Sequence, residues 1–105
     1  MAVCIVQTMS NVTQQQYDAV SHRLGMDSPG AQPPQGALAH IAGPVDGGGW
    51  CVVSEWESTQ DFERFLNERL LPAVRAEGMD TEGFAPVKFE VYRSMGVGHA
   101  EGSAR

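Results

Sequence analysis

The 105-residue sequence predicts an α+β domain with the element order β-α-β-β-α-β. Three observations carry this prediction. Strand-like segments stand near both ends, a pair of such segments flanks a glycine-rich turn in the middle, and two helical periodicities separate them. In this ferredoxin-like order, a four-stranded antiparallel sheet carries both helices on one face. The domain is expected to span residues 1–95, with residues 96–105 as a flexible tail.

The first third of the chain predicts a strand, a helix and a long connection. Residues 2–8, "AVCIVQT", favour a strand because β-branched residues dominate and no breaker interrupts them. Thr13 and Gln16 have the spacing of a capping box, which predicts a helix over residues 14–24. Residues 25–36, "GMDSPGAQPPQG", are rich in Gly and Pro and predict an irregular segment or a flap.

The middle of the chain predicts a hairpin followed by the second helix. Residues 37–44 and 50–56 form two strands around "VDGGG". Ser58 is the expected N-cap of a helix whose apolar stripe runs toward Gly78, its expected end. Pro72 falls inside this stripe and is expected to kink or break the helix.

Composition limits the classes of partner and site. The chain is 42% hydrophobic and 19% charged, and no apolar run approaches the roughly 18 residues that a membrane span requires. A net charge of −6 without a basic run excludes nucleic acid and anionic membranes as expected partners. The N-terminus does not resemble a signal peptide, so a cytoplasmic location is expected. Cys4 and Cys51 lack metal-ligand spacing and are expected to be reduced thiols, with no metal site.

The hairpin register decides which side chains share a face. A turn centred on Gly47 and Gly48 places His40 directly across from Glu55, whereas a bulged three-residue loop would shift this register. On the first register, one face carries Leu38, His40, Ala42, Cys51, Val53 and Glu55. The more apolar face, expected to meet the helices, carries Ala37, Ala39, Ile41, Trp50, Val52, Ser54 and Trp56.

The fourth strand, residues 87–93, divides in the same way by strict alternation. Val87, Phe89 and Val91 are expected toward the helices, and Lys88, Glu90 and Tyr92 on the opposite face. A sheet face that is half polar and half apolar suits burial against a second copy of itself. The sequence therefore predicts a homodimer.

Two roles are open for His40 and its predicted partner Glu55. They form either a cross-strand ion pair that fixes the dimer interface, or a general base whose pKa Glu55 holds up. Trp50 and Trp56 likewise either pack in the core or form an aromatic wall of a ligand pocket. Tyr17, on the first helix, is placed to reach that pocket, and His22 is expected at the surface.

The strand "WCVVSEWES", followed directly by the helix "TQDFERFLNERLLPAV", resembles the dimeric α/β-barrel superfamily, and within it the antibiotic-biosynthesis-monooxygenase-like proteins. The segment "HIAGP" before the Gly-rich turn adds to this resemblance, which covers about residues 2–93. It implies two sheets packed back to back in a homodimer, and a ligand cavity between sheet and helices. It also implies cofactor-independent oxygenation of an aromatic or polyketide-like molecule in secondary metabolism. The alternative is a non-catalytic ligand-binding or assembly module of the same fold.

The resemblance also suggests which residue types surround the substrate. Quinone-forming oxygenases of this superfamily use a Trp, an Asn and a Tyr or Arg around a phenolic substrate. The residues of those types in this sequence are Tyr17, Trp50, Trp56, Asn67 and Arg64. Haem-degrading members instead place a Trp and a His on the second helix, where this chain has Phe65 and Arg75. Haem degradation is therefore not expected, and no cofactor is expected.

Overall fold

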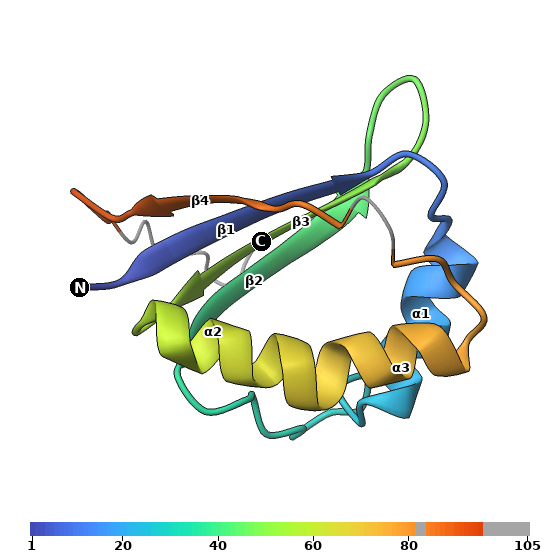
Figure 1. The fold of residues 1–105 in the computed structure, drawn as a ribbon, viewed down its shortest axis with the longest axis horizontal. Coiled ribbons are helices and arrows are strands. Elements are labelled where there is room, and N and C mark those ends of the chain that lie inside the picture. The colour runs from blue at the N-terminus through green and yellow to red at the C-terminus, as the bar shows by residue number, and fades with distance from the viewer. Residues whose placement is uncertain (82–83, 96–105) are drawn as a thin grey trace.

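The computed structural model describes residues 1–81 and 84–95, so the predicted tail, 96–105, lies outside the described residues. The elements are β1 (Val3–Met9), α1 (Gln14–Arg23), β2 (Ala37–Pro44), β3 (Trp50–Trp56), α2 (Thr59–Phe65), the π-helical turn η1 (Leu66–Leu70), α3 (Leu71–Ala76) and β4 (Val87–Glu90). The strands form an antiparallel sheet in the order β2-β3-β1-β4, and the helices cover one face of it (Figure 1). The predicted α+β fold is confirmed, and no described helix is long and apolar enough to span a membrane.

The predicted capping box begins α1. The backbone N–H of Gln16 donates to Oγ1 of Thr13 at 3.2 Å, and the backbone N–H of Thr13 donates to Oε1 of Gln16 at 2.9 Å. These two bonds satisfy amides that have no partner inside the helix. The segment after α1, residues 25–36, has no regular element, as its Gly and Pro content predicts.

Pro72 does not break the second helix. Segments α2, η1 and α3 follow one another without interruption, and the ribbon is continuous through them (Figure 1). The N–H of Leu71 donates to the carbonyl of Leu66, five residues back, in a π-type bond. Pro72 cannot donate, and its ring would crowd the carbonyl of Glu68, so the wider turn accommodates it. Gly78, at a φ of 75°, follows the end of the helix as predicted.

The core lies between the sheet and the helices in two clusters. One contains Val3, Ile5, Trp56 and Phe62, and the other contains Val20, Ala73 and Val74. In the first cluster the ring of Trp56 packs edge-on against Phe62, with ring centroids 5.7 Å apart. The space between the two clusters is where a cavity opens.

The hairpin register differs from the primary prediction by one residue. The N–H of Val45 donates to the carbonyl of Gly49 at 3.0 Å, which leaves a three-residue loop rather than a two- or four-residue one. His40 therefore pairs with Ser54, not with Glu55. A shift of one residue moves a side chain to the other face of a sheet, so the predicted His40–Glu55 pair is wrong. A further register shift, a β-bulge, lies between Ala37 and Ala39.

The corrected register changes which side chains meet the helices. The β3 prediction is confirmed, since Trp50, Ser54 and Trp56 are buried. Ile41 was expected there too, but it is 70% exposed on the face opposite the helices, here called the open face. Glu55 also lies on the open face, opposite Cys4 of β1. Burial of the Cys4 thiol, and to a smaller extent the nearby Glu55 carboxylate, raise the pKa of Cys4.

The predicted faces of β4 are also reversed. Val87 pairs with Val6 and Phe89 pairs with Cys4, so both β4 side chains lie on the open face. Lys88 lies on the helix side, where its Nζ donates to Oγ1 of Thr59 at 3.4 Å. The prediction failed because it assigned the more apolar set to the core, and here the open face is apolar as well.

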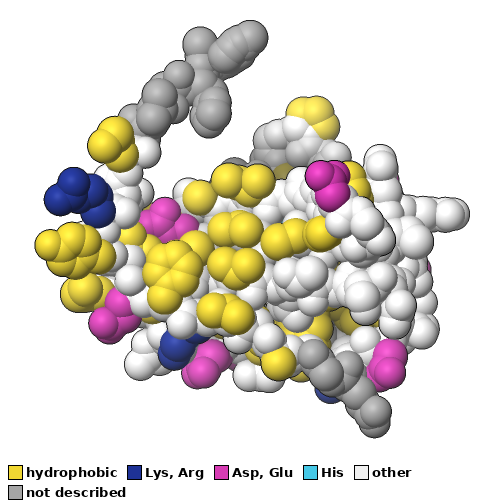
Figure 2. Space-filling model, turned by 90° about the horizontal axis from the view of Figure 1, so that it is seen from above, with side chains coloured by type: hydrophobic (Ala, Val, Ile, Leu, Met, Phe, Trp, Pro, Cys, Tyr) yellow, Lys and Arg dark blue, Asp and Glu magenta, His cyan; other side chains and the backbone are white. Residues whose placement is uncertain are grey.

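The open face carries an aliphatic row that crosses all four strands, made of Ile41, Val53, Val6 and Val87. Phe89 adjoins this row and is 50% exposed. Seen from this side, hydrophobic side chains gather in a broad patch over the sheet (Figure 2). Within the described residues, no element covers this patch.

Candidate functional site

A cavity of about 290 Å³ lies between the sheet and the helices. Its lining is almost entirely apolar and comes from both layers, including Val52 and Phe65. Met26, Pro33 and Pro34 of the irregular segment 25–36, here called the flap, also contribute, so this segment forms part of the cavity wall. The exceptions are the polar side chains of Gln7, Tyr17, Ser21, His40 and Ser54. A concave apolar site with a few placed polar groups is typical of small-molecule binding.

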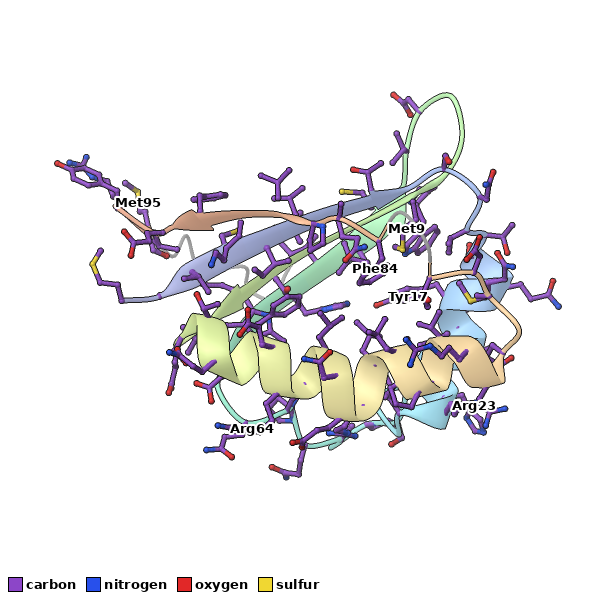
Figure 3. All side chains as sticks on the ribbon, in the orientation of Figure 1. Met9, Tyr17, Arg23, Arg64, Phe84 and Met95 are labelled. Carbon is purple, nitrogen blue, oxygen red and sulfur yellow. The ribbon has the colours of Figure 1, made fainter. Side chains whose placement is uncertain are left out.

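Tyr17 and His40 meet inside this cavity. Oη of Tyr17 lies 2.6 Å from Nε2 of His40, and the two rings stack with centroids 6.1 Å apart. The indole of Trp50 packs on Tyr17, with ring centroids 5.1 Å apart. Tyr17 comes from α1 and His40 from β2, so the contact depends on how the first helix packs on the sheet. Figure 3 shows Tyr17 between the two layers, and Met9 and Phe84, also labelled there, line the same cavity.

Burial sets the charge state of this pair. It lowers the pKa of His40 from its usual value, which favours the neutral imidazole. It raises the pKa of Tyr17, partly offset by the hydroxyl of Ser21, which favours the neutral phenol. At neutral pH the Tyr17 hydroxyl therefore donates to an uncharged Nε2. The predicted role of Glu55 in holding up the pKa of His40 is wrong, because Glu55 lies on the other face.

The two tryptophans have different positions. Trp56 lines the cavity, and its Nε1 donates to Oγ of Ser54 at 2.9 Å. Trp50 packs on the ring of Tyr17, and its buried Nε1 has no hydrogen-bond partner among the described residues. Trp56 thus belongs to the core and also lines the cavity, whereas Trp50 is buried beside Tyr17 and is not among the lining residues.

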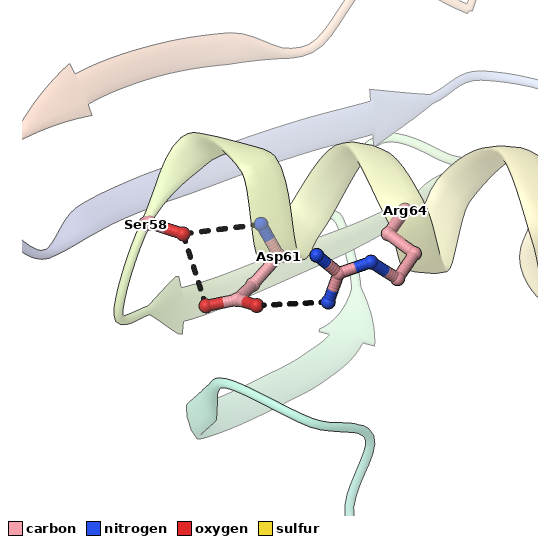
Figure 4. A network of polar contacts seen from close by, with 3 residues as sticks. All are labelled: Ser58, Asp61 and Arg64. Atoms are coloured by element: carbon pink, nitrogen blue, oxygen red, sulfur yellow. Dashed lines mark hydrogen bonds and ion pairs between the residues drawn. The ribbon is translucent and has the colours of Figure 1, made fainter.

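The structure does not bring Arg64 or Asn67 to the cavity. Both are exposed on the second helix, and Figure 3 shows Arg64 pointing away from the sheet. Nη1 of Arg64 lies 3.2 Å from Oδ1 of Asp61, and the other carboxylate oxygen, Oδ2, accepts a bond from the hydroxyl of the N-cap Ser58 (Figure 4). Arg64 therefore forms an ion pair with Asp61, in the first turn of α2, instead of reaching the cavity. His22, also exposed, contacts Asp27 at the surface, as expected.

Two polar cavity residues, Gln7 and Ser21, were not identified in the sequence analysis. Gln7 is 7% exposed and lies on the helix side of β1 together with Val3 and Ile5. Period-two alternation along β1 was the available signal, because it places a polar residue in line with two core positions.

Comparison with known proteins gives matches in structure alone. No family model and no curated protein matches the sequence. A candidate antibiotic biosynthesis monooxygenase from Chloroflexus aurantiacus aligns at 15% identity and a TM-score of 0.60, covering 93% of this chain and 100% of its own. SnoaB, a cofactor-independent oxygenase from Streptomyces nogalater, aligns at 13% identity and a TM-score of 0.55, covering 90% and 95%.

A third similar structure is the haem-degrading protein of Mycobacterium tuberculosis, at 18% identity and a TM-score of 0.55, covering 91% of this chain and 100% of its own. These identities are low, so the matches establish architecture rather than activity. The chain has the ferredoxin-like fold of the antibiotic-biosynthesis-monooxygenase-like proteins.

Proposed function

We propose that this protein is a cofactor-independent monooxygenase that acts on an aromatic or polyketide-type molecule in secondary metabolism. The observation that carries the proposal is the Tyr17–His40 hydrogen bond inside an apolar cavity. A neutral imidazole paired with a neutral phenol can accept a proton where water does not compete. The similarity in fold to a cofactor-independent oxygenase supports this choice of reaction.

The proposed chemistry begins with loss of a proton from an acidic phenol or a C–H group beside a carbonyl. That proton passes to the oxygen of Tyr17 while the Tyr17 hydrogen passes to Nε2 of His40, 2.6 Å away. The resulting electron-rich anion reacts with dioxygen. For anthrone as a test substrate, one molecule of dioxygen gives anthraquinone and water, which balances the atoms without an external reductant.

Haem degradation fits these residues poorly. His40 is the one histidine among the described residues that line the cavity, and its Nε2 is bonded to Tyr17. On the second helix, Phe65 lines the cavity, whereas Arg75 is exposed. An axial nitrogen ligand for haem would therefore require breaking the Tyr17–His40 pair.

Oxygen uptake with anthrone under air tests the proposal. His40→Gln should lower turnover by about 10²-fold or more, the usual contribution of a positioned proton acceptor, with the fold intact. Tyr17→Phe should lower it as well, because the relay loses its hydroxyl. Glu55→Gln, on the opposite face, is the matched control and should keep wild-type turnover.

Absence of oxygen uptake with anthrone and other phenolic substrates would favour the non-catalytic binding or assembly module. An active His40→Gln variant would show that His40 is not the proton acceptor. Melting temperatures of all variants separate lost chemistry from lost folding.

We also propose that the open face pairs with a second copy of the chain. Ile41 and Val87, at the two ends of the aliphatic row, are 70% and 64% exposed, which is unusual for large aliphatic side chains gathered on one face. A row that crosses the whole sheet is self-complementary under a two-fold axis, so each copy covers the other. The observed face is more apolar than the half-polar face that the sequence predicted, which strengthens this proposal.

A further inference from the structure

The floor of the cavity contains the buried side-chain amide of Gln7, which forms no hydrogen bond with the other described residues. Gln7 is 7% exposed, and across the described part of the chain its side chain has no hydrogen-bond partner. Nε1 of Trp50 also has no partner among the described residues, but it is completely inaccessible to solvent. The amide atoms of Gln7 are not completely inaccessible. They open into the cavity that Gln7 lines. Buried amides are nearly always hydrogen-bonded, so one directed into an apolar cavity indicates a ligand group that would complete it.

The position of Gln7 relative to His40 follows from the sheet register. Gln7 on β1 pairs with Val52 on β3, whereas His40 on β2 pairs with Ser54. The two residues are thus separated by two strand spacings and one two-residue step, about 12 Å between their Cα atoms from standard sheet dimensions. Val52 and Ser54 form the floor between them, and the hydroxyl of Ser54 is engaged by Trp56.

This spacing places two polar points at opposite sides of an apolar floor. One is the Tyr17–His40 pair, and the other is the Gln7 amide. A ligand that satisfies both must be apolar along its length, to match the lining, and must carry a hydrogen-bonding group such as an oxygen at each end. A ligand with a single oxygen leaves one of the two points unpaired.

We propose that Gln7 and the Tyr17–His40 pair hold the two ends of a fused-ring aromatic molecule with two oxygen functions, either two hydroxyls or a hydroxyl and a keto group. The Gln7 amide suits both forms, because its Oε1 accepts from a hydroxyl and its Nε2–H donates to a carbonyl. Gln7 is therefore a specificity-determining residue. This inference deepens the proposed function, since it names the substrate class of the same cavity.

Equilibrium binding under nitrogen tests the inference without any turnover. Three probes share one ring system and differ in oxygen count: naphthalene, 2-naphthol and 2,6-dihydroxynaphthalene. Their dissociation constants are measured by calorimetry on the wild type, Gln7→Leu and Tyr17→Phe. Leu is apolar and close to Gln in size, so it removes the amide and keeps most of the volume.

The wild type should bind the diol about three- to tenfold more tightly than 2-naphthol, the ordinary value of one more hydrogen bond. Gln7→Leu should abolish that gain, leave the affinity for naphthalene unchanged and raise the melting temperature, because a desolvated, unpaired amide is gone. Tyr17→Phe should reduce the gain from the second hydroxyl, because only the imidazole of His40 is left at the opposite end of the cavity floor.

Three results would overturn the inference. Equal weakening of all three probes by Gln7→Leu would mean that Gln7 only shapes the cavity. A lower melting temperature with unchanged diol affinity would mean that the amide supports the fold. No detectable binding of the diol to the wild type would exclude this ligand class. If the diol does not bind but anthrone is turned over, the proposed function stands and this inference fails. If the diol binds as expected but no substrate is turned over, this inference stands and the proposed function fails.

Discussion

The two faces of the sheet are both apolar, yet they differ in what they can bind. The helix side is concave and carries separated polar groups, the Tyr17–His40 pair and Gln7, within an apolar lining. The open face carries the aliphatic row and Phe89. A concave site with spaced polar atoms selects a small molecule, whereas an extended apolar patch accepts another surface. The two sides of one sheet thus present two chemically different surfaces.

The largest expected effect tests the open face as a dimer interface. Val53→Asp places a charge in the middle of the aliphatic row and, in a symmetric dimer, does so in both copies. A buried, unpaired charge costs about 3–5 kcal/mol, which is roughly a thousandfold in the dissociation constant. Light scattering over a dilution series should change from dimer to monomer.

The control for this experiment is Glu55→Gln, which lies on the same face but removes no apolar contact. It should remain dimeric. A wild-type protein that scatters as a monomer at micromolar concentration would refute the dimer, and so would a Val53→Asp variant that stays dimeric.

The second prediction compares one residue type across the sheet. Phe62 is 7% exposed in the core, and Phe89 is 50% exposed on the open face. In a Val53→Asp background, which removes dimerisation, Phe62→Ala should lower the free energy of unfolding by about 3–5 kcal/mol. Phe89→Ala should lower it by about 1 kcal/mol or less, because little apolar area leaves the monomer.

Denaturant titration measures both values, and the same pair in the wild-type background sharpens the comparison. There, Phe89→Ala should weaken the dimer, whereas Phe62→Ala should act on folding. Equal losses for the two variants in the monomeric background would mean that the open face is part of the monomer core.

The sequence predicts the elements well and their faces less well. Strands β2 and β3 have the predicted bounds because the glycine-rich turn separates two uninterrupted apolar segments. The face of His40, however, depends on whether the hairpin loop has an even or an odd number of residues, and "VDGGG" is compatible with both. The faces of β4 could not be read from hydrophobicity, since Val87 and Phe89 lie on an apolar face that the helices do not cover.

The candidate site was predictable in its residues but not in its contacts. Tyr17 and His40 were both candidates, yet their hydrogen bond depends on the packing of α1 against β2, which local patterns do not encode. Arg64 has a residue type suited to a phenolic site, but its helical position places it beside Asp61 at the surface. Residue type alone does not separate the cavity side of a helix from its solvent side.

The third prediction concerns the flap, which forms part of the cavity wall. Gly36 ends this segment at a φ of 85°, and a Cβ there would overlap the side chain of Asp61. Gly25 has a similar φ of 72°, but a Cβ there meets nothing within 4 Å. Both Gly→Ala changes carry the backbone cost of the left-handed region, and Gly36→Ala should cost about 1–3 kcal/mol more from steric overlap.

Thermal melting of the two variants provides the comparison, and the open face provides a control. Because Gly36 lies at the flap, its substitution should weaken binding of the diol probe and leave the oligomeric state unchanged. Equal melting temperatures for Gly25→Ala and Gly36→Ala would show that the flap is not held against Asp61.

The smallest expected effect tests the burial of His40. Burial lowers the pKa of His40 in the folded protein below its unfolded value of about 6.5, so the unfolded chain binds more protons in the interval between the two values. Stability should therefore be complete above about pH 6.5 and decline as the pH falls toward the folded value. His40→Gln should flatten this part of the stability curve, measured by denaturant titration at closely spaced pH values. Tyr17→Phe should keep the slope, because the imidazole stays buried when its hydrogen bond is lost. If the free energy of unfolding of the wild type stayed constant below about pH 6.5, or rose on acidification, His40 would be solvated. The helix side of the sheet would then not bury this side chain more than the open face does.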